Sequence, residues 1–256
     1  MTPNSVQIDT DWDFYFCTIE DRPASIMLDL AIQPHAPLMD KSSLIQVTVT
    51  LRQPNEFGLT NQAEAEVLYV MEDQMAEHLS TYLGGMYVAR CTSKGKRIFY
   101  FYCNSSVDYQ RVVEEIMDGF PEYRHQVNAQ VDANWTYYLD FLYPSAYEYQ
   151  SILNRRVVDR LEQQGDNIHK AREVEHFLYF SSETDRKRFM DQIRERSFSV
   201  RSQAFAADSP SMPFSLMISR VDRVDTSSID QIVLHLLQAA ENCNGRYEGW
   251  GTTVTA

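Results

Sequence analysis

The chain has 256 residues, of which 44% are apolar and 12% aromatic, and its formal net charge is −13. Because domains usually contain about 100–150 residues, a chain of this length is expected to form two of them. It contains no run of the ~20 apolar residues that cross a membrane, and its N-terminus lacks the basic start and apolar stretch of a signal peptide, which favours a cytoplasmic location.

The negative charge is concentrated in the first half of the chain. Residues 1–146 carry 20 Asp and Glu against 9 Lys and Arg, whereas residues 147–256 carry 16 against 14. An acidic field repels nucleic-acid phosphates and attracts basic partners, so direct nucleic-acid binding by the first half is disfavoured. The plain alternative is that these charges only keep the protein soluble.

The first half of the sequence alternates strand and helix patterns, which predicts a mixed α+β domain. A helix is expected after Thr60, ending at Gly84-Gly85, and a second one with Ser105 or Ser106 as its N-cap. A hairpin turns at "SKGK" between two alternating runs. The runs that predict strands or extended chain, rich in β-branched and aromatic residues, are 13–19, 24–32, 43–51, 86–103, 123–132 and 134–144.

The second half follows the order αβαββα and then a final strand. Helices are expected at 147–164, from Ser181 or Ser182 onward, and at 228–243; strands are expected at 171–180, 198–205, 214–221 and 246–254. A ferredoxin-like antiparallel sheet layered with helices satisfies this order with short connections. We therefore predict domains at 1–145 and 146–256, joined near "PSAYE".

Residue patterns that support catalysis or cofactor binding are weak. Asp9, Asp11 and Asp13 share one face of an extended segment, but no further ligands complete a metal site. Glu175 and His176 are adjacent in a strand, so their side chains point to opposite faces and do not converge as an acid/base pair. The four cysteines form no C-x-x-C pair. We therefore expect no catalytic residue, no metal and no cofactor.

The stretch "GRYEGWGT" at 245–252 holds three glycines around Tyr247, Glu248 and Trp250. No helix follows it, so the stretch cannot cradle a phosphate at a helix N-terminus. Glycines beside a large ring permit a bulge or a close backbone approach. We expect the Trp250 ring to pack in the core of the second domain; the alternative is a recognition surface.

"YEGWGT" after a long amphipathic helix, "VEHFLYF" after "QQGDN", and "SFSV" resemble the bacterial regulator of ribonuclease E activity B over residues 148–254. The first half, through "DWDFYF", "YVARCTSKGKRIFYFYC" and "NWTYYLDFLYP", is similar to a bacterial family of unknown function that is found fused to it. The resemblance implies a non-catalytic protein that binds and restrains an endoribonuclease. The candidate contact residues are Glu175, Tyr247, Glu248 and Trp250.

Two other functions are possible readings of the sequence. A hydrolase-type enzyme could hold its pocket between the domains, with aromatic walls from "YLDFLYP" and "YEGWGT". Nucleic acid could contact the basic helix in the second half. However, acidic residues are interleaved with the basic ones there, as on a solvated, salt-bridged helix. The basic residues are Arg186, Lys187, Arg188, Arg194 and Arg196, and the acidic ones are Glu183, Asp185, Asp191 and Glu195. We expect a protein partner, and the sequence predicts no oligomeric state.

Overall fold

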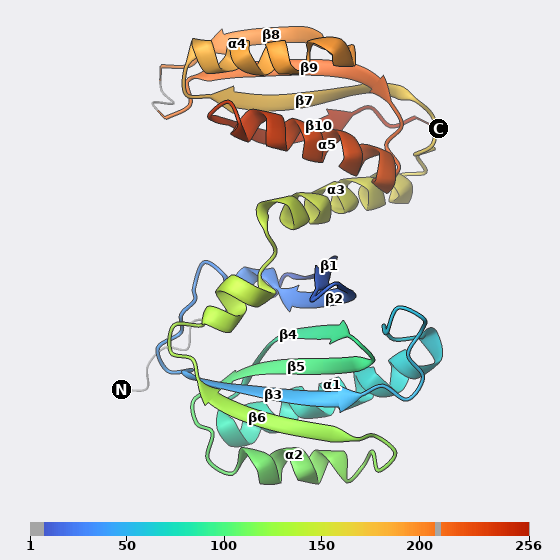
Figure 1. Ribbon diagram of the computed structural model, residues 1–256, viewed down its shortest axis with the longest axis vertical. Helices are drawn as coiled ribbons and strands as arrows, with labels where there is room; N and C mark the ends of the chain where they lie inside the picture. The colour runs from blue at the N-terminus through green and yellow to red at the C-terminus, as the bar shows by residue number, and fades with distance from the viewer. Residues whose placement is uncertain (1–7, 208–210, 256) are drawn as a thin grey trace. The chain divides into compact units, whose positions relative to one another are not determined.

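The computed structural model describes residues 8–207 and 211–255 of the chain, which divides into two compact units, residues 1–148 and 149–256 (Figure 1). Each unit has its own antiparallel sheet and its own helices, as expected for a two-domain α+β protein. Within the described residues, none of the helices is both long and apolar enough to cross a membrane.

The first unit is built on a six-stranded antiparallel sheet with the strand order β1-β2-β4-β5-β3-β6. The expected hairpin is present, since β4 and β5 pair from Ser93 and Lys96 at the turn. The strands are β1 (Trp12–Ile19), β2 (Arg22–Asp29), β3 (Ser43–Thr50), β4 (Met86–Ser93), β5 (Lys96–Cys103) and β6 (His125–Val131), with a short 3-10 helix η1 (Leu30–Ile32) after β2.

Two helices, α1 (Gln62–Leu83) and α2 (Tyr109–Met117), cover one face of this sheet. The α1 helix begins where the Asn61 side chain accepts the Glu64 N–H, and it ends at Gly84, whose φ of 59° is left-handed. This confirms the helix that the sequence predicts. Its apolar stripe packs into a cluster with Val112, Val113 and Ile116 of α2 and with Ile45, Val47, Phe99 and Phe101 of the sheet.

The predicted N-cap of the second helix is wrong. The α2 helix starts at Tyr109, with Asp108 as its N-cap residue, and not directly after Ser105 or Ser106. The Ser105 hydroxyl instead accepts the Val107 N–H at 3.1 Å, which closes a local turn before the helix.

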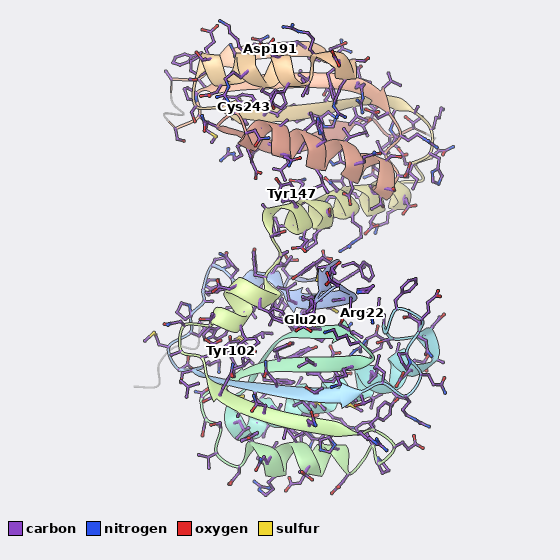
Figure 2. The ribbon with its side chains drawn as sticks, viewed as in Figure 1. Glu20, Arg22, Tyr102, Tyr147, Asp191 and Cys243 are labelled. Atoms are coloured by element: carbon purple, nitrogen blue, oxygen red, sulfur yellow. The ribbon has the colours of Figure 1, made fainter. Side chains whose placement is uncertain are left out.

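The expectation of extended chain over 134–144 is also wrong, because Tyr137–Leu142 form a π-helical turn, η2. Its start is fixed by Asp132, whose carboxylate accepts the backbone N–H groups of Thr136 and Tyr137 at 2.9 and 3.0 Å. The same carboxylate accepts the Tyr102 hydroxyl at 2.5 Å (Tyr102 is labelled in Figure 2). The Asp132 carboxylate thus caps the first turn of η2 and bends a segment whose alternating aromatic residues are typical of a strand.

The second unit holds a four-stranded antiparallel sheet in the order β10-β7-β9-β8. If the four strands are numbered 1 to 4 in chain order, their order in the sheet is 4-1-3-2. One helix connects strands 1 and 2 and another connects strands 3 and 4, which is the ferredoxin-like arrangement that the sequence predicts. The elements are α3 (Ala146–Gln163), β7 (Arg172–Phe180), α4 (Glu183–Gln192), η3 (Arg194–Arg196), β8 (Ser199–Phe205), β9 (Phe214–Asp222), α5 (Thr226–Glu241) and β10 (Gly245–Thr252).

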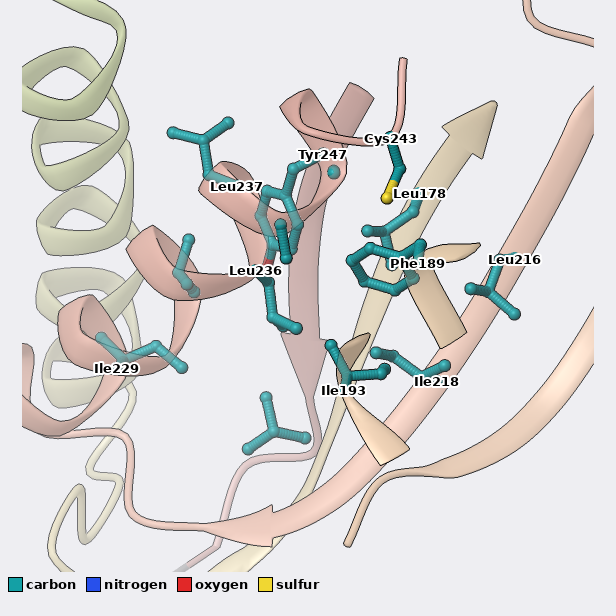
Figure 3. Packing of buried hydrophobic residues seen from close by; sticks show 14 of the residues in the cluster. Leu178, Phe189, Ile193, Leu216, Ile218, Ile229, Leu236, Leu237, Cys243 and Tyr247 are labelled. Atoms are coloured by element: carbon teal, nitrogen blue, oxygen red, sulfur yellow. The ribbon is translucent and has the colours of Figure 1, made fainter. Parts of the chain in front are cut away.

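Helices α3, α4 and α5 supply apolar side chains to one core together with the sheet. Figure 3 shows the side chains from α4, α5 and the strands. Phe189 of α4 and Leu236 of α5 are fully buried there, beside Leu178 of β7 and Ile218 of β9. The Ser182 hydroxyl accepts the Asp185 N–H at 3.0 Å, so one of the two predicted caps of α4 is confirmed.

Candidate functional site

Strand β7 separates the second sheet into two faces. Val174, His176 and Leu178 are buried, whereas Glu175 and Phe177 between them are not. Because neighbouring strand residues point to opposite faces, the buried set defines an inner face that packs on the helices. We call the other side the outer face; it consists of Glu173, Glu175, Phe177 and Tyr179 with their partners on β8, β9 and β10.

A β-bulge in β10 decides where the residues of "GRYEGWGT" point. Tyr247 pairs with Leu178 and Gly249 pairs with Phe177, so Glu248 is an extra residue without a partner in β7. The bulge resets the alternation, and Trp250 comes to lie opposite His176. Tyr247 and Trp250 therefore both lie on the inner face, although they are three residues apart.

Tyr247 is a core residue. Only 5% of its surface is exposed, and its ring lies between α5 and the sheet (Figure 3). Its hydroxyl is 2.8 Å from His176 Nδ1, and burial raises the pKa of the phenol well above its usual value. Burial, and to a smaller extent Arg220, lowers the pKa of His176 to about 3. Both members of this pair are therefore neutral at physiological pH.

Trp250 packs partly buried against the same core. Its indole Nε1–H donates to Asn154 Oδ1 at 3.0 Å, and the Asn154 amide nitrogen donates to Asp230 at 2.7 Å. The ring thus links β10 to α3 and α5, which is the role we expect for it. Two of the four candidate contact residues, Tyr247 and Trp250, are therefore turned away from the outer face.

The outer face is apolar at its centre. Phe177 is 37% exposed and pairs with Met217 of β9 on one side and with Gly249 of β10 on the other. A Cβ built on Gly249 would meet nothing within 4 Å, and one on Gly251 would meet only the Phe177 ring, at 3.9 Å. The two glycines thus leave one flank of the Phe177 ring without neighbouring side chains.

Glu175 and Glu248, the other two candidate residues, lie at the outer face with different partners. Glu248 pairs with Arg246 at 2.9 Å, and Arg246 also lies over the Tyr179 ring at 5.7 Å. Glu175 has no ion pair within the described residues and lies opposite Gly251. It is therefore a partly buried carboxylate available to a basic group of a partner.

Sequence reasoning missed Phe177, Tyr179 and Met217. The signal was present in "REVEHFLYF", where the residues between the buried positions are two acids followed by two aromatics. Solvated faces of antiparallel sheets are normally polar, so two aromatic residues in succession on such a face indicate a contact surface.

In the first unit, a cavity of about 390 Å³ is lined partly by the "YLDFLYP" segment. Tyr15, Cys17, Asp140 and Glu148 contribute its polar groups. Burial, and then the nearby Glu148, raises the pKa of the Cys17 thiol to about 11, so the thiol is protonated and a poor nucleophile. Within the described residues, no three His, Cys, Asp or Glu side chains lie close enough to hold a metal ion.

Comparison with known families gives two matches. Residues 10–143 match the "Family of unknown function (DUF695)", and residues 151–252 match "Regulator of ribonuclease activity B". Both resemblances that the sequence motifs indicate are thereby confirmed. No curated protein matches the chain. A crystal structure of an unknown protein from Galdieria sulphuraria aligns over 81% of this chain and 96% of that chain, with 7% identity and a TM-score of 0.22, too low to support an argument.

Proposed function

Because the chain belongs to the family of unknown function DUF695 and its second unit matches a regulator of ribonuclease activity, we propose that it regulates a ribonuclease by binding it. We further propose that the outer face of the second sheet is the contact surface and that the protein acts as an inhibitor without chemistry of its own.

The observation that carries this proposal is the exposed flank of Phe177. Protein interfaces are dominated by a few aromatic or arginine anchors that become fully desolvated on binding. Phe177 sits at the centre of the outer face, and the missing side chains of Gly249 and Gly251 give a partner access to its ring. An apolar side chain of the partner that fills this space would bury the ring.

The charges of the chain fit a ribonuclease as partner. An enzyme that binds RNA carries basic residues that contact phosphates. Glu175 lies beside Phe177 without an ion pair among the described residues, and residues 1–146 of the same chain carry 20 Asp and Glu against 9 Lys and Arg. An acidic protein with a free carboxylate at its contact surface complements a basic partner and accelerates the encounter.

The test is capture of partners from a native lysate of the source organism, followed by mass spectrometry. We expect the wild-type chain to enrich an endoribonuclease and Phe177→Ala to lose that enrichment. Phe205→Ala is the matched control, because Phe205 is 63% exposed in the same unit but pairs with Phe214 on the inner face. Equal capture by all three proteins would contradict the outer face as the contact surface. A capture without any ribonuclease would contradict the function.

A further inference from the structure

A second feature of the second unit lies on the helix side of its sheet. There, a cavity of about 230 Å³ opens between η3, the end of β9 and one side of α5. The residues that line it are Arg196, Phe198, Arg220, Gln231, Ile232 and His235. It differs from the outer face in composition, because three of its six residues are cationic or can become so.

The Arg220 side chain is held in place by three contacts. Arg220 donates Nε–H to Asp222 at 2.8 Å and Nη1–H to the backbone oxygen of Arg196 at 3.1 Å. Its guanidinium lies 4.4 Å from the centre of the Phe198 ring. The Arg196 side chain is exposed and has no ion pair within the part of the chain that the structure describes. The Asp222 carboxylate thus pairs with one of the two arginines, Arg220.

His235 adds a group that can change its charge. Burial, and then the charges of Arg196 and Arg220, lowers the pKa of this imidazole. Of the cavity's other neighbours, Asp222 pairs with Arg220, and the buried His176, whose ring packs edge-on against Phe198 at 5.7 Å, stays neutral. An anion in the cavity would offset the repulsion from the arginines and allow His235 to take up a proton.

We propose that this cavity binds the phosphate group of a small phosphate monoester. With His235 protonated, the two arginines and Asp222 leave two uncompensated positive charges, which a phosphate dianion matches and a single carboxylate does not. Guanidinium groups bind phosphate oxygens through paired N–H donors, and the Gln231 amide can add another. Phe198 and Ile232 form an apolar wall for the organic part of the ligand. This site is independent of the proposed contact with a ribonuclease.

The test uses the full chain, with inorganic phosphate and adenosine monophosphate as probes. We expect saturable binding of both by calorimetry, with adenosine monophosphate at least as tight as phosphate. Acetate at the same concentrations should not bind. The pKa of His235, followed by NMR of its ring, should rise when either probe is added.

Two variants distinguish the site from a general charge effect. Arg196→Gln should weaken binding about tenfold, whereas Arg194→Gln, an exposed arginine that pairs with Asp191 outside the cavity, should leave it unchanged. His235→Gln should remove the pH dependence of phosphate affinity. The proposal is overturned if neither probe binds saturably, if the two arginine variants weaken binding equally, or if phosphate binds while adenosine monophosphate is excluded.

Discussion

Replacement of Trp250 by alanine tests the inward orientation that the β10 bulge gives to this residue. The mutation removes an indole ring that packs partly buried against the core and a 3.0 Å hydrogen bond from Nε1 to Asn154 Oδ1. Full burial of a Trp ring is worth about 3–5 kcal/mol against truncation to Ala, and a hydrogen bond contributes about 1 kcal/mol. Because the ring is only partly buried, we expect the free energy of unfolding to fall by about 2–3 kcal/mol.

Two further variants divide this loss into its parts. Asn154 Oδ1 also accepts the Gln150 amide at 3.0 Å, so removing the indole does not leave this buried oxygen without a donor. Trp250→Phe keeps most of the packing and should cost about 1 kcal/mol. Glu248→Ala removes one half of an exposed ion pair and should cost less than about 0.5 kcal/mol.

The assay is urea denaturation followed by circular dichroism, with hydrogen exchange to locate the loss of protection. We expect the loss in α3, α5 and β10, the elements that the ring links. If Trp250→Ala unfolds like the wild type but fails to capture the partner, the ring is a recognition element and its assignment to the core is wrong.

Three other predictions follow from the charges and the division of the chain. Burial lowers the pKa of His176 to about 3, whereas in the unfolded chain it is near 6.5. Below about pH 6.5 the unfolded chain therefore binds a proton that the folded chain does not, and the folded state loses stability as the pH falls toward 3. Stability should therefore drop by roughly 2 kcal/mol between pH 6.5 and 5, and His176→Gln should flatten that slope; equal slopes in both proteins would refute the assignment. A fragment of residues 146–256 should unfold cooperatively, because this second half has its own core, and a disordered circular dichroism spectrum would refute the predicted boundary. Affinity for the captured partner should fall several-fold from low to physiological salt, since exposed charges are screened beyond about 8–10 Å there, and a salt-independent affinity would exclude electrostatic steering.

The fold of the second unit could be predicted from the sequence because local signals agree there. Apolar spacing distinguishes its helices from its strands, and Ser182 marks the start of α4. In the first unit, the π-helical turn after Asp132 could not be predicted. It depends on Tyr102, which is thirty residues away in the sequence and fixes the same carboxylate.

The candidate site was predicted only in part, because a bulge changes which side chains share a face. Strict alternation would place Tyr247 and Trp250 on opposite faces, and the extra residue Glu248 brings them to the same one. The register between β7 and β10 also places Gly249 beside Phe177 and Gly251 beside Glu175. Strand pairing of this kind is a tertiary property, and no local pattern in "GRYEGWGT" contains it.

The most direct test of the proposed function is the affinity of the captured ribonuclease for the wild-type chain and for Gly251→Thr. A Cβ at this position meets only the Phe177 ring, at 3.9 Å, and threonine favours strands, so stability should be unchanged or higher by up to ~1 kcal/mol. The added side chain fills the space beside Phe177 that a partner would occupy. We expect a stable variant whose affinity is at least about tenfold lower. A stable Gly251→Thr variant that binds the ribonuclease as tightly as the wild type would contradict the outer face as the regulatory surface.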